Sequence, residues 1–343
     1  MARKSTDRSG RPTLVDVAKE AGVSAITVSR TIRSPEIVSA AARQKVEAAI
    51  RKLGYTPDPA ASALASHSTS TIGLLVPSLT NNVFSDVLRG VYDGVEGTRY
   101  FVQIGNYRYS ALEEEGLIRN FLSQRPAGLV ISSMDQTPAA RALLESAPCP
   151  VVQIMEIADR AVDMSVGFDQ LAAVRAGARH LFDCGYRRPG FLSARMDPRA
   201  QRRLAAFRDF NEAAGVLDDR RIMTTPQPSS VGMGRLLMEQ LLSRAPETDA
   251  VMCNNDDLAV GALMEAKRRN IPVPSMLGIC SFNDIEMVRQ MVPSLTAVAS
   301  PRREIGVRAI AMLLAEIAEP GSVADRHVDL GYQMIAREST SRR

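Results

Sequence analysis

Side chains able to recognise the edges of DNA bases gather in a short segment, residues 24–33, with the sequence Ser-Ala-Ile-Thr-Val-Ser-Arg-Thr-Ile-Arg. Arg30 is the strongest candidate, because a planar guanidinium can bond O6 and N7 of a guanine together. Ala25 and Ile26 can offer only apolar contacts, for instance to thymine methyl groups. The candidate DNA-contacting set is completed by Thr13, Ser24, Thr27, Ser29 and Arg33.

Two short helices joined by a glycine turn are predicted to carry these side chains. Thr13 can cap the first helix, with Asp16 three residues later to reach back to it, and Gly22 ends it. Ser24 can cap a second helix of only about two turns. Apolar residues recur at helical spacing in both segments, at Leu14, Val17, Ala18, Ala21, Ile26, Val28 and Ile32. This is the helix-turn-helix arrangement, in which the first turns of the second helix face the bases.

A third helix is predicted to complete the unit, with Ser39 as its cap and Gly54 at its end. The apolar positions of this helix are Val46, Ala49, Ile50 and Leu53. From residues 13–32 alone, a small helical hairpin buried in a larger core is the alternative interpretation. The third helix favours the DNA-binding interpretation.

The chain resembles the LacI/GalR family of bacterial repressors along most of its length. The motifs that carry the resemblance begin with Thr13-Leu-Val-Asp-Val-Ala, Ala21-Gly-Val-Ser, Thr27-Val-Ser-Arg30, Val38-Ser, Lys45-Val and Leu53-Gly-Tyr-Thr-Pro57. The resemblance implies that residues 59–70 form a hinge helix, which pairs with its twin in a dimer and inserts Leu64 into the minor groove. Such a wedge kinks the duplex and gains contact surface.

The hinge departs from the family's pattern, which usually has Asn after Tyr-x-Pro, whereas this chain has Asp58 followed by Pro59. Asp is a good helix cap and Pro suits the first helical position, so a helix can still begin there. A carboxylate is unfavourable beside phosphates. A flexible linker is the alternative for this segment, and a segment too short to be helical alone could fold only on DNA.

Charge is distributed as phosphate binding requires. Residues 1–60 carry 11 Lys and Arg against 6 Asp and Glu, a net charge of +5, while the remaining residues carry 31 against 32, a net charge of −1. The positive excess therefore lies at the DNA-binding end. An excess of this size is also compatible with ordinary surface solubility. Residues 1–11 are expected to be a disordered basic arm.

Short apolar runs alternate with helical patterns from residue 72 onward, which predicts parallel sheets covered on both faces. The predicted strands are 72–76, 100–105, 128–132, 151–155, 190–193, 250–253 and 278–282, and the predicted helices are 84–95, 112–122, 171–182, 204–214, 258–268 and 304–317. The expected fold is thus a small all-α head followed by α/β subdomains of the doubly wound type. The resemblance implies a periplasmic-binding-protein-like regulatory domain, with two such subdomains hinged around a cleft.

Domain boundaries follow from these patterns and from the resemblance. We expect a basic arm at 1–11, the helix-turn-helix domain at 12–58, the hinge and linker at 59–70, and an effector-binding and dimerisation domain at 71–343. The chain should cross between the two subdomains of this domain near residues 165 and 300. The chain ends without a leucine heptad, so a homodimer is expected in preference to a tetramer.

Ligands of doubly wound sheets bind beyond the carboxyl ends of the strands, so polar residues that follow predicted strands are candidates for effector binding. The candidates are Ser78, Asn82 and the neighbouring apolar Phe84 after the first strand, and Glu156, Asn255 and Asn283 after later ones. Helix capping is the alternative role for Asn and Asp at such places. The resemblance adds Arg203, because Arg203-Leu-Ala-Ala-Phe207 is similar to the family's Arg-x-x-Gly-Phe, with Ala206 in place of the glycine. It also assigns effector binding to Asn255 and Asn283.

One departure predicts the charge of the effector. The family usually has Phe-Asp-Asp where this chain has Phe282-Asn-Asp284. Asn283 keeps the reach of Asp without its charge, and Arg203 can bond a carboxylate in bidentate fashion. Segments such as Val76-Pro-Ser-Leu-Thr-Asn81 and Ala194-Arg-Met-Asp197 are similar to the gluconate-operon repressors. We therefore expect gluconate or a related aldonate, with a neutral sugar as the alternative, and repression relieved by this effector on a near-palindromic operator.

Other functional classes find less support in the sequence. Gly232-Met-Gly234 lacks the third glycine of a dinucleotide-binding motif and is predicted to be a turn. The three histidines, His67, His180 and His327, show neither a nucleophile motif nor metal-ligand spacing, so we expect no catalytic residue, cofactor or metal. A transport-type sugar-binding protein would need an export signal and has no use for residues 1–66. An α/β enzyme acting on a small metabolite is the weakest alternative.

Cysteines and hydropathy indicate the compartment. Four cysteines lie far apart without a C-x-x-C pair, and we expect buried thiols in a reducing environment. No stretch approaches twenty apolar residues, and no apolar signal segment follows the charged N-terminus. We therefore expect a cytoplasmic protein associated with the bacterial nucleoid and not with a membrane.

Overall fold

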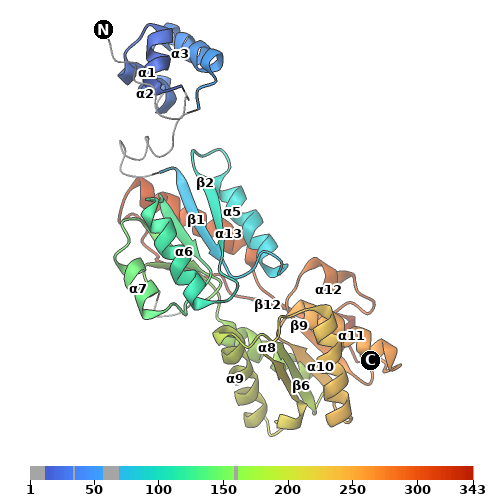
Figure 1. Cartoon of the computed structure of the whole chain (residues 1–343). Coiled ribbons are helices and arrows are strands. Elements are labelled where there is room, and N and C mark those ends of the chain that lie inside the picture. The colour runs from blue at the N-terminus through green and yellow to red at the C-terminus, as the bar shows by residue number, and fades with distance from the viewer. Residues whose placement is uncertain (1–11, 34, 57–68, 158–160, 343) are drawn as a thin grey trace. The chain divides into compact units, whose positions relative to one another are not determined.

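The computed structural model describes residues 12–33, 35–56, 69–157 and 161–342, and contacts divide the chain into two units, residues 1–69 and 70–343 (Figure 1). The predicted basic arm, Leu64 and nearly all of the predicted hinge helix lie outside the described residues. Within the described residues, no helix combines the length and the apolar character needed to cross a membrane.

The described residues of the first unit contain three α-helices, α1 (Leu14–Ala21), α2 (Ala25–Arg33) and α3 (Ala40–Leu53). The predicted caps are confirmed at the start and end of α1. The backbone N–H of Thr13 donates to the Asp16 carboxylate at 2.8 Å, the N–H of Asp16 donates to the Thr13 hydroxyl at 3.3 Å, and Gly22 is left-handed with φ +64°. Val17, Val28 and Val46, one from each helix, are fully buried and form the centre of a small core.

The second unit contains two six-stranded sheets. The first has the strand order β11-β5-β4-β3-β1-β2 and is parallel throughout, with β1 (Thr71–Val76), β2 (Phe101–Asn106), β3 (Gly128–Ile131), β4 (Val151–Ile154), β5 (Met164–Gly167) and β11 (His327–Asp329). The second has the order β12-β10-β9-β8-β6-β7, with β6 (Pro189–Ala194), β7 (Ile222–Thr225), β8 (Ala250–Cys253), β9 (Gly278–Asn283), β10 (Thr296–Ala299) and β12 (Gln333–Ile335). Among the described strands of this sheet, β10 and β12 are the one antiparallel pair.

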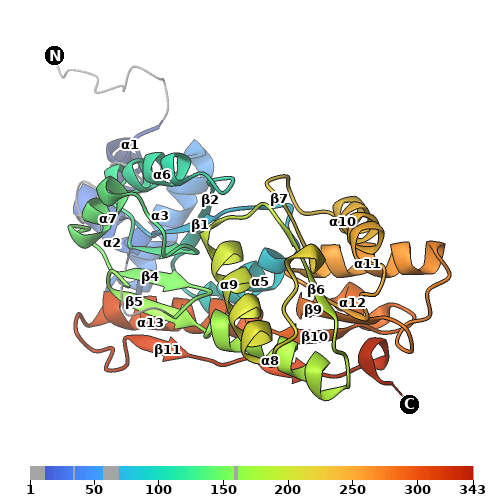
Figure 2. The same ribbon diagram turned by 90° about the horizontal axis from the view of Figure 1, so that it is seen from below.

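Helices cover both faces of each sheet. The first sheet lies between α5 (Val83–Val95) with α13 (Arg302–Ala318) and α6 (Ala111–Ser123) with α7 (Pro138–Glu145) (Figure 1). The second lies between α8 (Gln170–Asp183) with α9 (Pro198–Ala213) and α10 (Val231–Arg244) with α11 (Asp256–Arg268), and the short α12 (Glu286–Gln290) follows β9 (Figure 2). Because both faces are covered, β1, β3, β4, β8 and β9 are apolar and buried almost throughout. The predicted fold class is confirmed.

The chain passes between the two subdomains three times. It leaves the first sheet after β5, returns after β10 through α13, and crosses again between β11 and β12. The last crossing was not predicted from the sequence. Three connections that share one region of the molecule suit a hinge, because each absorbs the same relative motion of the two subdomains.

Two sequence expectations are wrong. Gly232 and Gly234 lie in the first turns of α10, not in a turn between elements. The reason is packing: a Cβ on Gly234 would lie 2.5 Å from the carbonyl oxygen of Leu258, so glycine allows α10 and α11 to approach closely. The cysteines are free, but only Cys253 and Cys280 are buried, whereas Cys149 and Cys184 are half-buried.

Candidate functional site

The outer face of α2 carries the side chains that were predicted to face bases. Val28 and Thr31 are buried against the rest of the first unit, whereas Ile26 is 65% exposed and Arg30 is exposed. An isoleucine this exposed on a short helix has no partner in the core of its own unit. The face therefore combines an apolar side chain with a guanidinium that can reach into a groove.

The remaining candidates for DNA contact have different positions. The hydroxyl of Ser24 accepts from the backbone N–H of Thr27 at 3.1 Å and bonds the Thr27 hydroxyl at 2.8 Å, so this pair caps α2. Ala25 and Ser29 are half-buried on the same helix. The Thr13 side chain caps α1, and nothing is described for Leu64 or for the side chain of Arg33.

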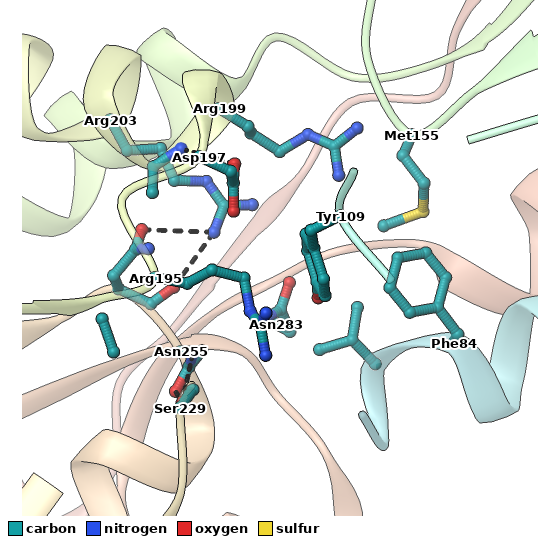
Figure 3. Close-up of a pocket in the computed structure, with 14 residues that line it drawn as sticks. Phe84, Tyr109, Met155, Arg195, Asp197, Arg199, Arg203, Ser229, Asn255 and Asn283 are labelled. Atoms are coloured by element: carbon teal, nitrogen blue, oxygen red, sulfur yellow. Dashed lines mark hydrogen bonds between the residues drawn. The ribbon is translucent and has the colours of Figure 1, made fainter. Parts of the chain in front are cut away.

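A cavity lies between the two subdomains of the second unit, at the carboxyl ends of their strands (Figure 3). It encloses about 530 Å³, open solvent at its mouth included. The first subdomain contributes Val83, Phe84, Tyr109 and Met155 to its lining, and the second contributes Ala194, Arg195, Asp197, Arg199, Ala200, Arg203, Ser229, Asn254, Asn255 and Asn283. Three of its lining residues are arginines.

The structure brings four of the seven predicted effector-binding residues to this cavity: Phe84, Arg203, Asn255 and Asn283. Asn255 also caps α11, where its Oδ1 accepts from the N–H of Leu258 at 3.1 Å, and its amide bonds the hydroxyl of Ser229 at 2.8 Å. The alternative role of helix capping is therefore real for this residue. It does not exclude ligand contact, because the side chain still lines the cavity.

Three predicted residues do not line the cavity. The hydroxyl of Ser78 accepts from the N–H of Asn81 at 3.0 Å within the loop after β1, and Asn82 is exposed at the start of α5. Glu156 is buried, and its carboxylate binds Arg199 at 3.4 Å and Arg202 at 2.7 Å. The two arginines therefore bind the Glu156 carboxylate, which the sequence analysis had predicted to contact the effector.

Arg203 is the most unusual charge in the cavity. It is 6% exposed, and its guanidinium donates to Gln170 Oε1 at 2.9 and 2.6 Å and to the carbonyl oxygen of Asn254 at 3.0 Å. These partners are neutral, and no ion pair joins Arg203 to a carboxylate of the described residues. Burial, helped by the nearby charge of Arg199, lowers the pKa of Arg203 to about 9. A buried cation without an anionic partner is costly, and an anion in the cavity would compensate it.

Asn283 provides the complementary polar group. Its side chain is 2% exposed, and its Oδ1 has no hydrogen-bond partner among the described residues. A buried acceptor left without a donor is destabilising. Since Asn283 lines the cavity, a ligand hydroxyl could supply the missing donor.

Several lining residues adopt strained backbone conformations. Tyr109, Met155, Arg195 and Asn283 have φ of +60°, +80°, +69° and +101°, a region that non-glycine residues seldom occupy. Such strain gathers at binding sites, where surrounding structure enforces it. The four residues come from both subdomains, so the strain surrounds the cavity and is not confined to one loop.

Residues that the sequence analysis did not assign to the site include Tyr109, Met155, Arg195, Asp197 and Arg199. The guanidinium of Arg195 lies 4.1 Å from the ring centre of Tyr109, and this contact joins the two subdomains (Figure 3). Arg195 and Asp197 belong to the segment Ala194-Arg-Met-Asp197, which had been quoted only as a family likeness. That segment directly follows β6, so the rule for strand ends would have found them.

The described residues contain no group of three or more His, Cys, Asp and Glu placed to hold a metal ion. The cavity instead presents three guanidinium groups, several amides, the hydroxyl of Ser229, the carboxylate of Asp197 and the aromatic rings of Phe84 and Tyr109. Together these groups can bind a small, hydroxylated anion.

Comparisons with known proteins agree with both halves of this description. A model of bacterial regulatory proteins of the lacI family matches residues 13–58, and a model of periplasmic binding protein-like domains matches residues 178–340. The HTH-type transcriptional regulator GntR of Pseudomonas aeruginosa is 42% identical over 98% of this chain and 98% of its own, and GntR of Escherichia coli K12 is 35% identical over 94% and 97%.

Solved structures give the same result. A LacI family transcriptional regulator from Silicibacter pomeroyi is 32% identical, with a TM-score of 0.90 over 96% of this chain and all of its own. The lac repressor dimer bound to operator and an anti-inducer is 25% identical, with a TM-score of 0.82 over 96% of this chain and 99% of its own.

Proposed function

Since the chain belongs to the LacI family of bacterial regulatory proteins, we propose that it is a transcriptional repressor whose affinity for its operator is lowered by a sugar acid, gluconate or a related aldonate. DNA binding and regulation by a small molecule are properties of the family. Its relatives are named transcriptional regulators, so the chain is a regulator and not an enzyme. The chemical class of the effector is the new part of this proposal.

The observation that carries the proposal is the buried guanidinium of Arg203, which faces the cavity with only neutral partners. A carboxylate is the natural counter-ion for a guanidinium in a site of low dielectric constant. The unpartnered oxygen of Asn283 supports a ligand that also carries hydroxyl groups. An aldonate has one carboxylate and several hydroxyls. The likeness to regulators named GntR is consistent with this choice.

We further propose how effector and operator are coupled. The protein would act as a homodimer with the domain limits given by the sequence, the outer face of α2 would read the operator, and closure of the cavity would alter the contact between protomers. Coupling of this kind is typically about 1 to 3 kcal/mol, equivalent to about 5- to 150-fold in affinity. It is reciprocal, so the operator should weaken effector binding by the same factor.

The test is calorimetric titration of the full-length protein with D-gluconate, D-glucose and D-ribose. Gluconate should bind tightest, whereas preferential binding of a neutral sugar would show that the effector class is wrong. The variant Asn283→Asp adds a negative charge to the cavity. It should weaken the binding of gluconate by at least about tenfold, equivalent to about 1.4 kcal/mol, and should affect the binding of glucose much less.

The sign of regulation needs a separate measurement. In a gel-shift experiment with the DNA that flanks the protein's own gene, gluconate should release the protein. A ligand that strengthens operator binding would make the effector a corepressor and would contradict this part of the proposal alone.

A further inference from the structure

Gln170 is the first residue of α8, where the chain passes from the first sheet to the second subdomain, and it is 2% exposed. Its Nε2 donates to the carbonyl oxygen of Met155 at 2.6 Å, and its Oε1 accepts from Nε and Nη2 of Arg203 at 2.9 and 2.6 Å. Arginine can only donate and a carbonyl can only accept, so the orientation of the amide is fixed by its partners. Gln170 thereby joins two walls of the cavity without lining it.

Arg203 makes no ion pair because this partner is neutral, although the nearby charges of Asp197 and Glu156 partly offset the effect of burial on its pKa. Where a carboxylate would form an ion pair with Nε and Nη2, the chain has a neutral amide of the same shape. The two nearest candidate acids are occupied elsewhere, since Asp197 caps α9 by accepting from the N–H of Ala200 at 3.1 Å, and Glu156 binds Arg199 and Arg202. The remaining contact of Arg203 is the ring of Phe282, whose centre lies 3.8 Å from the guanidinium carbon.

The bonds to Gln170 also leave a donor for the ligand. Gln170 Oε1 accepts from one of the two N–H groups on Nη2 of Arg203, so the bonds to Gln170 do not use the other N–H group. The guanidinium is at the same time held on its Nε side and through Nη1 at Asn254. It is therefore fixed in orientation before a ligand arrives, which lowers the entropic cost of binding.

We infer that Gln170 is a specificity-determining residue, which positions Arg203 by hydrogen bonding while its neutrality reserves the positive charge of that arginine for the carboxylate of the ligand. The inference rests on the proposed function, because it explains why the same cavity prefers a sugar acid to the corresponding neutral polyol. Gln170 acts through Arg203 and does not itself contact the ligand. Its replacement by an acid should therefore change selectivity, whereas loss of its hydrogen bonds alone should not.

Two substitutions separate the effect of a negative charge at position 170 from the effect of losing the hydrogen bonds of Gln170. Gln170→Glu and Gln170→Met both lose the hydrogen bond to Met155, but only the first adds a charge beside Arg203. The probes are D-gluconate and D-glucitol, which differ in having a carboxylate or a hydroxymethyl group at one end. Calorimetry on the full-length protein gives the ratio of their dissociation constants, and thermal unfolding together with operator binding without ligand reports whether each variant is folded.

We expect the preference for gluconate over glucitol to fall at least tenfold in Gln170→Glu. In Gln170→Met both ligands should bind more weakly while their ratio stays within about threefold of that of the unaltered protein. If Gln170→Glu does not fold, Asn254→Asp places a carboxylate on the Nη1 side of Arg203, leaves Gln170 intact and should lower the ratio similarly.

The outcomes distinguish this inference from the proposed function. If the unaltered protein binds neither probe or prefers glucitol, the proposed effector class is wrong and the role of Gln170 falls with it. If the unaltered protein prefers gluconate but the acidic variant keeps that preference, or the methionine variant loses it equally, only the inference about Gln170 is overturned.

Discussion

Arg202 of α9 binds Asp135 of the first subdomain through two parallel hydrogen bonds, Nη1 to Oδ1 and Nη2 to Oδ2, both 3.0 Å long. The same guanidinium reaches Glu156 at 2.7 Å, so one side chain of the second subdomain holds two acids that follow β3 and β4 of the first. The side chain of Glu156 is only 8% exposed, so part of this cluster is shielded from solvent. The cluster stabilises the arrangement in which the cavity is enclosed.

Arg202→Ala should therefore favour separation of the subdomains. We expect a loss of about 1.5 to 3 kcal/mol, the usual contribution of a hydrogen bond to a charged group, seen as a lower unfolding midpoint in urea and as weaker effector binding. Arg89→Ala is the matched control, because Arg89 also binds an aspartate at 3.0 Å but its side chain is 73% exposed. The control should change stability by less than about 1 kcal/mol. Equal effects of both substitutions would contradict the assigned role of Arg202.

The sequence predicted the centre of each sheet better than its margins. Strands such as β1 and β8 are continuous apolar runs because helices cover both of their faces. Five of the described strands were missed. The strands β7, β11 and β12 are short and partly exposed, and no apolar run marks them. The strands β5 and β10 are mostly buried, but small or polar residues interrupt their apolar runs. Their positions depend on neighbours distant in the chain, which local patterns do not contain.

The site was predictable where a strand end points directly at the cavity, as for Asn255 and Asn283. Glu156 was placed correctly after β4, but the sequence could not show that two arginines of α9 would bind its carboxylate. Tyr109 escaped notice because it enters the cavity from a loop, at a positive φ that no sequence rule assigns to tyrosine. Gln170 escaped it because the residue bonds Arg203 and Met155 but does not itself line the cavity.

Arg30→Ala tests the DNA-binding face of α2. Loss of a bidentate contact with a guanine should weaken operator binding by about 1 to 3 kcal/mol and relax the preference at one position of each half-site. Binding to a random duplex should change little, since that depends on phosphate contacts. Competition binding against operators substituted at every position would measure both effects. An equal loss on operator and random DNA would make Arg30 a phosphate contact.

Glu265 should make the stability of the fold depend measurably on pH in the acidic range. Hydrogen bonds from Arg268, at 2.6 and 2.9 Å, and then from Arg269, at 2.7 Å, lower the pKa of this buried carboxyl to about 2. A carboxyl whose pKa is lower in the folded state stabilises the fold at pH values above its unfolded pKa of about 4.3. That contribution is lost as the pH falls from about 4.3 towards about 2, because the unfolded chain takes up the proton first.

Glu265→Gln should accordingly lower the unfolding midpoint at pH 7 but reduce the further loss on going to pH 3. Thermal unfolding of both proteins at a series of pH values measures this difference. If the two curves stay parallel across that interval, the ion cluster around Glu265 is not the source of the acid sensitivity.

The contact between α10 and α11 offers a comparison within one helix. Gly234 is buried in α10, and a Cβ there would lie 2.5 Å from the carbonyl oxygen and 2.6 Å from the Cα of Leu258, which are backbone atoms that can move only with α11. Gly232 lies two residues earlier and is exposed, and its Cβ would meet only the hydroxyl of Ser230 at 3.9 Å. Alanine favours helix over glycine by up to about 1 kcal/mol at either position, so only the steric term differs.

Gly234→Ala should therefore destabilise the second unit by about 1 to 3 kcal/mol, the usual cost of overpacking, while Gly232→Ala should be neutral or stabilise it by up to about 1 kcal/mol. Urea unfolding of the full-length protein, followed by circular dichroism, measures both. Two similar values would mean that α10 and α11 do not pack at the distance described. Opposite signs of the two changes in unfolding free energy would show that helix packing requires glycine at position 234 and not at position 232, although the pair resembles a turn in the sequence.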